Sequence, residues 1–355
     1  MRVLITGGAG FVGSRLAIKF RKQQPDSEVV VFDNLKRRGS ELNLKTFKQL
    51  GITFVHGDIR SATDFSSLDD FKPDLFVEAS AEPSVHAGLS QDPHYLLDTN
   101  LLGTINCLEY ARKSCGLFVF LSTSRVYPIP ELIRIPLREL GERLMPESGW
   151  ATEGLTEHGI SETFPLKDYR SLYGSTKLCS EFLVKEYAHG FGLRSVINRC
   201  GVIAGAGQFG KVDQGVFTLW VAMHHFKKQL MYTGFGGRGL QVRDLLHPDD
   251  LFALICQQRD FKDDLRADVF NVGGGPDGSV SLKELTGLCQ ELTGNSIEIG
   301  SRPETAAVDM PWYITDASLA KKTFNWQPEY KTKDIIGDIA AWIKKDEKEL
   351  KEIFC

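Results

Sequence analysis

The sequence of 355 residues contains no apolar run that approaches the length needed to cross a membrane. It also lacks an excess of basic charge, because 46 acidic residues outnumber 42 lysines and arginines and leave a net charge of −4. We therefore expect neither a membrane nor a nucleic acid as a partner. A strand-like run begins at Arg2 and leaves no room for a signal peptide, so we expect a cytoplasmic protein.

Cysteine is scarce and scattered. The seven cysteines are an odd number, and they form neither a CxxC pair nor a Cys/His cluster with zinc spacing. We therefore expect reduced thiols and no metal site. The remaining composition, with 42% hydrophobic and 25% charged residues, is that of an ordinary globular protein. A chain of this length predicts one large domain and a smaller companion.

Glycine is abundant near the N-terminus, where it occupies positions 7, 10 and 13. The apolar run before these glycines, Arg2–Thr6, predicts a buried strand. After them, apolar side chains recur every four residues and predict a helix, at Val12, Leu16 and Phe20. A strand, a glycine turn and a helix N-terminus together can hold the pyrophosphate of a dinucleotide.

The second strand-like run, Val29–Phe32, ends in Asp33. A carboxylate at this place can bind the ribose hydroxyls of adenosine. The basic segment 36–38 follows closely and leaves an alternative open, a site for the 2′-phosphate of NADP. Because Asp33 would repel that phosphate at close range, NAD is the preferred cofactor.

Strand-like runs alternate with helical ones through the first 200 residues. Further runs of this kind are Thr53–Val55, Leu75–Val77, Leu117–Leu121 and Ser195–Ile197. The alternation predicts an α/β protein with a Rossmann-type, doubly wound parallel sheet. Ligands bind beyond the carboxyl ends of such strands, so the polar residues that follow each run are candidates for the site.

The alternation of strand-like and helical runs is interrupted at residues 128–170 and ends near residue 200. Residues 128–170 carry five prolines and predict a long loop near the site, which either caps it or varies on the surface. We therefore assign residues 1–200 to an NAD-binding domain and 201–355 to a smaller, mixed α/β substrate-binding domain. The two are expected to interleave, with about 240–275 returning to the first.

Tyr173 and Lys177 lie four residues apart and would share one face of a helix. A phenol with a pKa of about 10 is a poor base at neutral pH, and a neighbouring ammonium favours its ionised form. Beside a nicotinamide, such a pair can oxidise an alcohol. The spacing is common in helices, so its weight comes from the glycine turn and from Ser122 and Thr123 at the end of a strand.

Together these stretches resemble the extended short-chain dehydrogenase/reductase family of nucleotide-sugar epimerases and dehydratases. The matching segments are Thr6–Gly13, His56–Arg60, Asn100–Thr104, Ser122–Tyr127, Tyr173–Lys177 and Gln241–His247. The resemblance covers essentially the whole chain. It implies NAD as cofactor, a nucleotide sugar as substrate, and a homodimer or homotetramer.

The resemblance also implies roles for individual residues. The catalytic residues would be Thr123, Tyr173 and Lys177, with Tyr173 as acid and base and Lys177 on the nicotinamide ribose. With Tyr173 and Lys177, the cofactor contacts would be Gly7, Gly10, Phe11, Val12, Asp33, Asn34, Asp58, Ile59, Ala79, Asn100 and Ser122. The substrate contacts would be Ser124, Asn198, Gln208, Arg243 and Arg302. Arg243 would meet the pyrophosphate, unless it pairs with Asp244 or Asp249.

A narrower resemblance points to family members that invert carbon 2 of a CDP-linked sugar. It rests on Asp33–Gly39 with Asn43-Leu44, on Tyr169–Lys177, and on Gln208-Phe209 with Asp213–Gly215. Dehydratases of the family place Asp-Glu after the threonine, whereas Ser124 and Arg125 stand here. An arginine cannot protonate a leaving hydroxyl.

The sequence therefore predicts epimerisation through a transient ketosugar. Three alternatives stay open: epimerisation at carbon 4, net reduction or oxidation of a nucleotide sugar, and a non-catalytic NAD-sensing protein.

Overall fold

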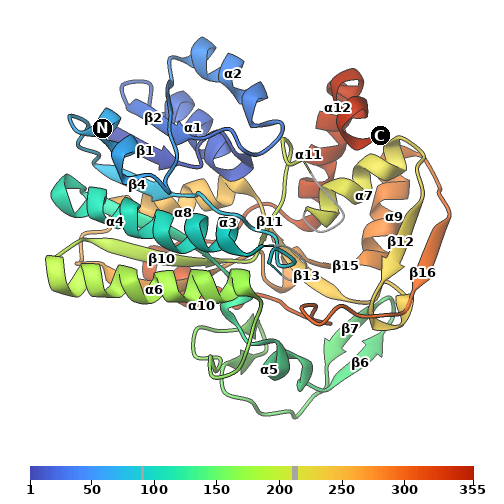
Figure 1. Ribbon diagram of the computed structural model, residues 1–355. Coiled ribbons are helices and arrows are strands. Elements are labelled where there is room, and N and C mark those ends of the chain that lie inside the picture. Colours follow the sequence, from blue (N-terminus) through green and yellow to red (C-terminus); the bar gives the residue numbers. More distant parts are fainter. Residues whose placement is uncertain (89–91, 210–214) are drawn as a thin grey trace.

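The computed structural model describes residues 1–88, 92–209 and 215–355. Its centre is a parallel sheet of seven strands in the order β14-β10-β5-β4-β1-β2-β3 (Figure 1). The strands are β1 (Arg2–Thr6), β2 (Glu28–Asp33), β3 (Thr53–His56), β4 (Leu75–Glu78), β5 (Leu117–Thr123), β10 (Ser195–Cys200) and β14 (Arg266–Val272). The strand order reverses between β1 and β4, which opens a crevice at their carboxyl ends. The predicted doubly wound α/β fold is confirmed.

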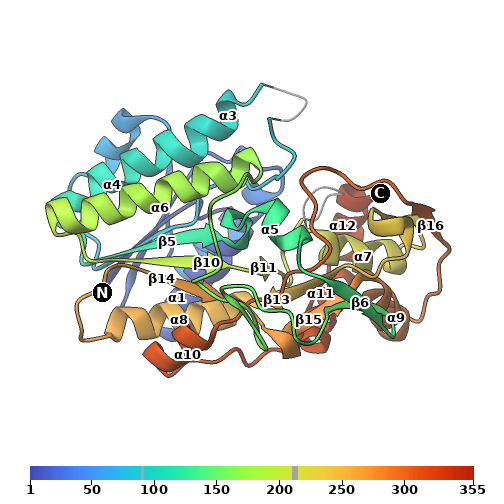
Figure 2. The same cartoon turned by 90° about the horizontal axis from the view of Figure 1, so that it is seen from below.

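Helices cover both faces of this sheet, as Figure 2 shows. One face carries α4 (Gly103–Ser114) and α6 (Leu172–Phe191), and the other carries α1 (Phe11–Gln23), α8 (Pro248–Asp260) and α10 (Ser318–Phe324). A sheet covered on both faces needs apolar side chains on both, and all seven residues of β5 are buried. This explains why the central strands read as unbroken apolar runs.

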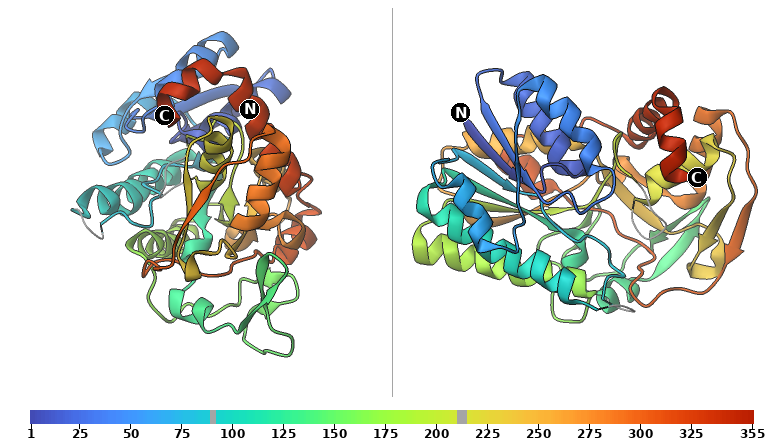
Figure 3. Two further views of the ribbon diagram at one scale, coloured as in Figure 1. Left: turned by 90° about the vertical axis from the view of Figure 1, so that its right-hand side faces the viewer. Right: turned by 45° about the horizontal axis from the view of Figure 1, so that its top comes forward.

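A smaller unit follows with its own core (Figure 3). It contains a sheet of β11 (Val202–Ile203), β13 (Val242–Leu246) and β15 (Ser279–Ser281), and the pair β12 (Leu230–Thr233) and β16 (Ile299–Arg302). Its helices are α7 (Val216–His225), α9 (Leu282–Thr293), α11 (Thr332–Lys345) and α12 (Glu347–Phe354). Trp220, Leu285 and Ile339 belong to its buried cluster. Strand β14 comes from within this part of the chain but lies in the large sheet.

Residues 128–170 form an excursion with little regular structure. It contains α5 (Ile129–Ile133), the hairpin of β6 (Leu137–Leu140) and β7 (Arg143–Pro146), and the hairpin of β8 (Leu155–Thr156) and β9 (Gly159–Ile160). Arg143 holds the first hairpin against the smaller unit through a two-pronged ion pair with Glu284, at 2.7 Å for each bond. The excursion therefore bridges the two units.

Short elements complete the chain. They are α2 (Asn43–Leu50), α3 (His94–Leu97), the π-helical turn η3 (Asp98–Leu102) and the 3-10 turns η1 (Ser40–Leu42), η2 (Ala62–Leu68), η4 (Ser124–Val126), η5 (Phe235–Gly237) and η6 (Pro276–Gly278). Among the helices of the three described ranges, none combines the length and the apolar character needed to span a bilayer.

Candidate active site

A cavity of about 1200 Å³ opens at the carboxyl ends of the parallel strands. Its walls include the glycine turn, residues that end or follow β2, β4, β5 and β10, and residues of α7, β12, β13 and β16. The large sheet and the smaller unit therefore both contribute to it. Its volume exceeds the usual range for a single drug-sized ligand and suits a dinucleotide with a second molecule.

The glycine turn forms one wall and fits a pyrophosphate. Gly7 has a φ of +63°, and a Cβ there would lie 2.8 Å from the carbonyl oxygen of Ala79. A Cβ on Gly13 would lie 2.3 Å from the carbonyl oxygen of Gly7, so α1 can approach the turn only without a side chain. Helix α1 begins at Phe11, and no side chain caps it. Its first N–H groups and its positive end are thus left for an anion, at a wall that also includes Gly10, Phe11 and Val12.

Asp33 lies at the end of β2, in the wall of the cavity. Its carboxylate accepts hydrogen bonds from the N–H groups of Ala9 (3.1 Å) and Leu35 (2.7 Å). Burial raises the pKa of this carboxyl and outweighs those hydrogen bonds. Lys36, Arg37 and Arg38 also line the cavity.

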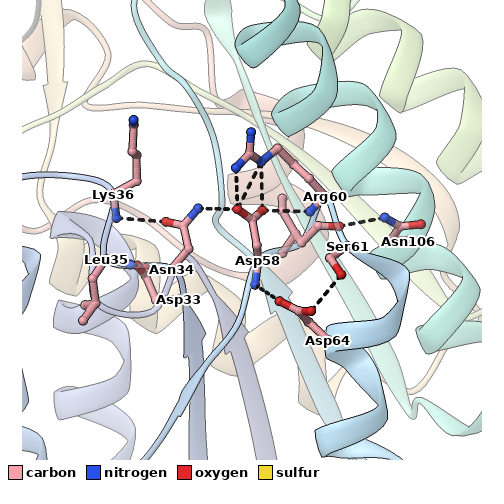
Figure 4. A network of polar contacts seen from close by, with 10 residues as sticks. Asp33, Asn34, Leu35, Lys36, Asp58, Arg60, Ser61, Asp64 and Asn106 are labelled. Atoms are coloured by element: carbon pink, nitrogen blue, oxygen red, sulfur yellow. Dashed lines mark hydrogen bonds and ion pairs between the residues drawn. The ribbon is translucent and has the colours of Figure 1, made fainter.

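Asp58 is held in the network of Figure 4. Its carboxylate accepts hydrogen bonds from Arg60 (2.7 Å at the shortest) and from the side-chain amide of Asn34 (2.9 Å). Burial raises the pKa of Asp58, but the hydrogen bonds from Arg60 and Asn34 prevail and lower it to about 2. Ile59 and Asn34 line the cavity, and the side chain of Asp58 between them is 21% exposed. A direct contact of Asp58 with the cofactor stays a prediction.

Asn100 supports the wall from behind. It lies in η3, is 1% exposed, and exchanges hydrogen bonds with the main chain of Glu82, accepting from its N–H at 2.8 Å and donating to its carbonyl at 3.1 Å. Its amide also donates to the Thr176 hydroxyl at 3.2 Å. The expected cofactor contact is thus replaced by a supporting role, because Asn100 holds the loop after β4, where Ala79 and Glu82 line the cavity.

Tyr173 and Thr123 meet in the cavity. Thr123 ends β5, Tyr173 lies in the first turn of α6, and both side chains line the cavity. Tyr173 packs among Val85, Ile129 and Val308 and is 9% exposed. Burial raises the pKa of Tyr173 to about 12, although Thr123 and the positive charge of Arg125 act in the opposite direction.

Lys177 lies one turn further along α6 and is 2% exposed. Its Nζ lies 3.9 Å from Oε2 of Glu78 and 4.1 Å from the centre of the Phe120 ring. Burial lowers the pKa of Lys177, while Glu78 raises it. The ammonium lies behind the wall of the cavity, next to the carboxylate of Glu78, one of the polar residues that directly follow a strand-like run in the sequence.

Ser122 and Ser124 flank Thr123, and both line the cavity. The Ser122 hydroxyl donates to Oε1 of Glu181 at 2.5 Å. Glu181 forms a two-pronged ion pair with Arg199, in which both side chains are almost fully buried. Ser122 therefore ties the end of β5 to this ion pair below the cavity.

Asn198 was expected to contact the substrate, and the structure corrects this. It is 0% exposed and exchanges two hydrogen bonds with Gln258 of α8, at 3.0 and 2.7 Å. In the sheet it is paired with Leu121, two positions before the end of β5. Cys200, at the end of β10, reaches the cavity instead.

Three expected substrate contacts line the far end of the cavity: Gln208, Arg243 and Arg302. Arg243 donates to the carbonyl oxygens of Val242 (2.7 Å) and Met310 (2.5 Å). The alternative ion pairs do not form, because Asp244 accepts a hydrogen bond from the Gly275 N–H (3.1 Å) and Asp249 pairs with Lys19 at 2.5 Å. Burial, with the nearby charge of Arg125, lowers the pKa of Arg243 to about 9.

Gln208 has less freedom than Arg243. Its amide donates to the carbonyl oxygen of Ile203 at 3.1 Å and accepts from the Thr218 hydroxyl at 2.9 Å. The carboxyl-terminal part of the motif that begins at Gln208, namely Asp213 and Gln214, lies outside the described residues.

Sequence reasoning missed several parts of the wall. Apolar side chains line the side formed by α7 and β12: Val216, Phe217, Leu219, Trp220, Leu230 and Met231. Nothing in the sequence separates them from core residues, since α7 is apolar almost throughout. Arg125 and Asp309 also line the cavity. The sequence did mark Arg125, because an arginine stands two residues after Thr123 where dehydratases carry a glutamate. That position argued against dehydration but was not taken to predict a residue of the cavity wall.

The cavity, the glycine turn and the Tyr173–Thr123 pair define an enzyme of the Rossmann class that works with a bound dinucleotide. The sequence model of the NAD-dependent epimerase/dehydratase family matches residues 3–273. The chain therefore belongs to this family, an extended branch of the short-chain dehydrogenases/reductases, and it uses NAD. The expected family, cofactor and enzymatic nature are confirmed.

Individual relatives extend this likeness over the whole chain. CDP-paratose 2-epimerase of Salmonella typhi is 30% identical over 353 residues, which cover 96% of this chain and 99% of the relative. A putative UDP-glucose 4-epimerase of Methanocaldococcus jannaschii is 27% identical over 97% of this chain and 99% of its own length. Among solved structures, a dTDP-glucose 4,6-dehydratase of Bacillus anthracis in complex with NAD is 25% identical and superposes with a TM-score of 0.76, covering 99% of each chain.

Proposed function

We propose that this protein epimerises a nucleotide-linked sugar through a transient ketosugar, at carbon 2 of a CDP-linked sugar. One observation carries the proposal: the same cavity is lined by Tyr173, by Thr123 and by the glycine turn that would bind the cofactor. An acid/base group and a dinucleotide cradle can therefore act on one sugar carbon.

The residues of the chain have defined parts in this reaction. Tyr173, ionised, accepts the proton of the sugar hydroxyl while Thr123 holds the same oxygen, and Tyr173 gives the proton back after the sugar has turned. NAD held at the glycine turn would supply the hydride acceptor for the sugar carbon and later the donor for its opposite face, so that no net oxidation would result. Lys177, next to Tyr173 on α6, is assigned to the nicotinamide ribose.

The surroundings of Thr123 favour epimerisation over dehydration. Loss of water requires an acid that protonates the leaving hydroxyl, and Ser124 and Arg125 stand where dehydratases of the family carry Asp-Glu. Neither side chain can supply that proton at neutral pH, since a guanidinium stays charged and a serine hydroxyl is far too weak an acid.

The far end of the cavity supports a substrate with a diphosphate. Arg243 and Arg302 line it, and a guanidinium fork matches phosphate oxygens. The choice of a CDP-sugar and of carbon 2 is supported by the relative from Salmonella typhi and by the narrower resemblance of the sequence. The relative from Methanocaldococcus jannaschii supports the second candidate, epimerisation at carbon 4. We further propose a homodimer or homotetramer, in line with the family resemblance.

A product analysis tests these assignments. The NAD-loaded enzyme is incubated with CDP-, UDP-, GDP- and dTDP-sugars, and the products are identified by NMR. We expect inversion at a single carbon, retention of a deuterium label at that carbon, and no net formation of NADH. Net reduction or oxidation would establish the dehydrogenase alternative, and binding of NAD with no product from any sugar would favour the NAD-sensing one.

Tyr173→Phe is the matched variant for this experiment. It keeps the ring that packs against Val308 and removes only the hydroxyl. We expect turnover to fall by about 10³-fold or more, while NAD stays bound. Near-normal turnover in this variant would refute the role assigned to Tyr173.

A further inference from the structure

We propose that Phe209 and Gly39 form a latch, a contact between the two units that closes one side of the cavity and retains the bound dinucleotide between turnovers. The proposal assigns a cofactor-retaining role to two residues outside the glycine turn. It goes beyond the proposed function, because it does not depend on which sugar is bound or on which carbon is inverted.

Gly39 forms the half of the latch that belongs to the large sheet. It lies in the loop after β2, directly before η1. Its φ is +93°, a conformation that favours glycine. A Cβ at this position would lie 2.5 Å from both Cδ2 and Cε2 of Phe209. The aromatic ring therefore rests directly on the main chain of Gly39, and any larger residue there would push the ring away.

Phe209 forms the half that belongs to the smaller unit. Its ring packs against the core of that unit and meets the ring of Trp342 edge-on, with 5.8 Å between the ring centres. Arg37, from the same loop as Gly39, adds a polar contact, because its Nη2 donates to the carbonyl oxygen of Phe209 at 3.3 Å. The latch thus joins an anchored side chain of one unit to a loop of the other.

The latch lies beside the cradle for the dinucleotide. The segment that carries Gly39 continues into Asn43, whose amide donates to the carbonyl oxygen of Ala9 in the glycine turn at 2.9 Å. On the other side of the latch, a Cβ on Gly207 would lie 3.9 Å from Nε of Arg15 in α1. Residues from both sides line the same cavity as the glycine turn. A dinucleotide in this cradle is therefore enclosed by contacts that join the two units.

A latch of this kind suits a reaction that regenerates its cofactor at every turnover. The dinucleotide need not leave, and a reduced dinucleotide that left before it returned its hydride would strand a ketosugar in the site. Closing segments shield a bound molecule and must open before that molecule can leave. Contacts of this type act mainly on the rate of dissociation. The latch should therefore slow the release of NAD.

The test measures the release of NAD without any sugar. The protein is loaded with isotope-labelled NAD and mixed with an excess of unlabelled NAD, and the label that stays on the protein is followed over time. We expect Phe209→Ala to accelerate release by about 10- to 100-fold, because it removes the ring that closes the latch. Gly39→Ala should act in the same direction, since its Cβ displaces that ring.

Phe226→Ala is the matched control. Phe226 packs against the same core of the smaller unit as Phe209, but it is not one of the described residues that line the cavity. This variant should lower the thermal midpoint and leave the release of NAD unchanged. An unchanged release rate in Phe209→Ala, or an equal acceleration in Phe226→Ala, would overturn the proposal.

The double variant Gly39→Ala/Phe209→Ala tests the contact itself. Once the ring is gone, Gly39→Ala should add less than about twofold to the release rate, because its effect acts through the ring. Two accelerations that multiply would show that the residues act independently and would refute the latch. Because no sugar is present, a failure to find an epimerised product would count against the proposed function alone.

Discussion

Two carboxylates near the glycine turn have opposite protonation behaviour because their neighbours differ. Asp33 is buried and receives only main-chain N–H groups, so its pKa is raised. Asp58 is paired with the Arg60 guanidinium, and its pKa is lowered to about 2 despite partial burial. Asp58 therefore stays ionised at neutral pH, whereas the raised pKa of Asp33 makes its protonation more sensitive to the groups around it.

Asp58→Asn tests the contribution of this pair to stability. We expect the free energy of unfolding to fall by about 1–2 kcal/mol at pH 7, because Arg60 loses its anionic partner. The folded-state pKa of Asp58 is depressed, so its stabilisation is complete above pH 4 and disappears as the pH falls toward 2. Urea unfolding at several pH values measures this. Asp69→Asn, at an exposed carboxylate, is the control, and a difference that does not depend on pH would contradict the assignment.

For single residues, the sequence predicted which segments lie at the site better than it predicted the hydrogen-bond partners of each side chain. The glycine turn could be predicted because its turn, strand and helix are adjacent in the chain. The partners of Asn100 and Asn198 could not, since Glu82 and Gln258 reach them through the fold rather than through a fixed spacing. Arg60, by contrast, is a local partner, two residues after Asp58. A polar residue that follows a strand can therefore contact a ligand, or it can instead hold neighbouring elements of the site in place through hydrogen bonds.

At the scale of elements, the 128–170 excursion is attached to the smaller unit at a few points. Arg143 of β7 bonds to Glu284 of α9 and to Ser279 of β15, where Glu284 also completes the cap of its own helix. The guanidinium thus holds together three elements. The proline content of this segment predicted its irregular course, but not its two hairpins or this docking.

Arg143→Gln should loosen the hairpin of β6 and β7 without disturbing the cofactor wall. We expect faster proteolytic cleavage within 128–170 and a loss of about 1–3 kcal/mol in stability, since Glu284 loses a charged, partly buried partner. NAD content should not change. Arg138→Gln, on the exposed side of the same hairpin, serves as control, and equal cleavage rates in the two variants would argue against the docking role.

The whole molecule places one cavity against both of its units, so ligands there should couple them. We expect NAD and a nucleoside diphosphate to raise the thermal midpoint further together than NAD does alone. At 100 times its Kd the diphosphate would add about 2.7 kcal/mol, a shift of a few degrees for a chain of this size. Thermal scans with CDP, UDP, GDP and dTDP would rank the bases, and an unchanged midpoint with all four would contradict a nucleotide site.

The alternation of strands and helices was sufficient to predict the parallel sheet, because each crossover is local and right-handed by default. It was not sufficient to show how the smaller unit folds over the carboxyl ends. That arrangement depends on contacts such as Arg125 with Val308, which join residues far apart in sequence.

The position of β14 has a consequence for the folding of this protein during its synthesis. Strand β10 leaves the exit tunnel well before β14, its neighbour in the sheet, has been synthesised. For several seconds of translation its open edge therefore carries unpaired main-chain groups that could join another chain. In that interval the nascent polypeptide has an open sheet edge, which favours association with other chains.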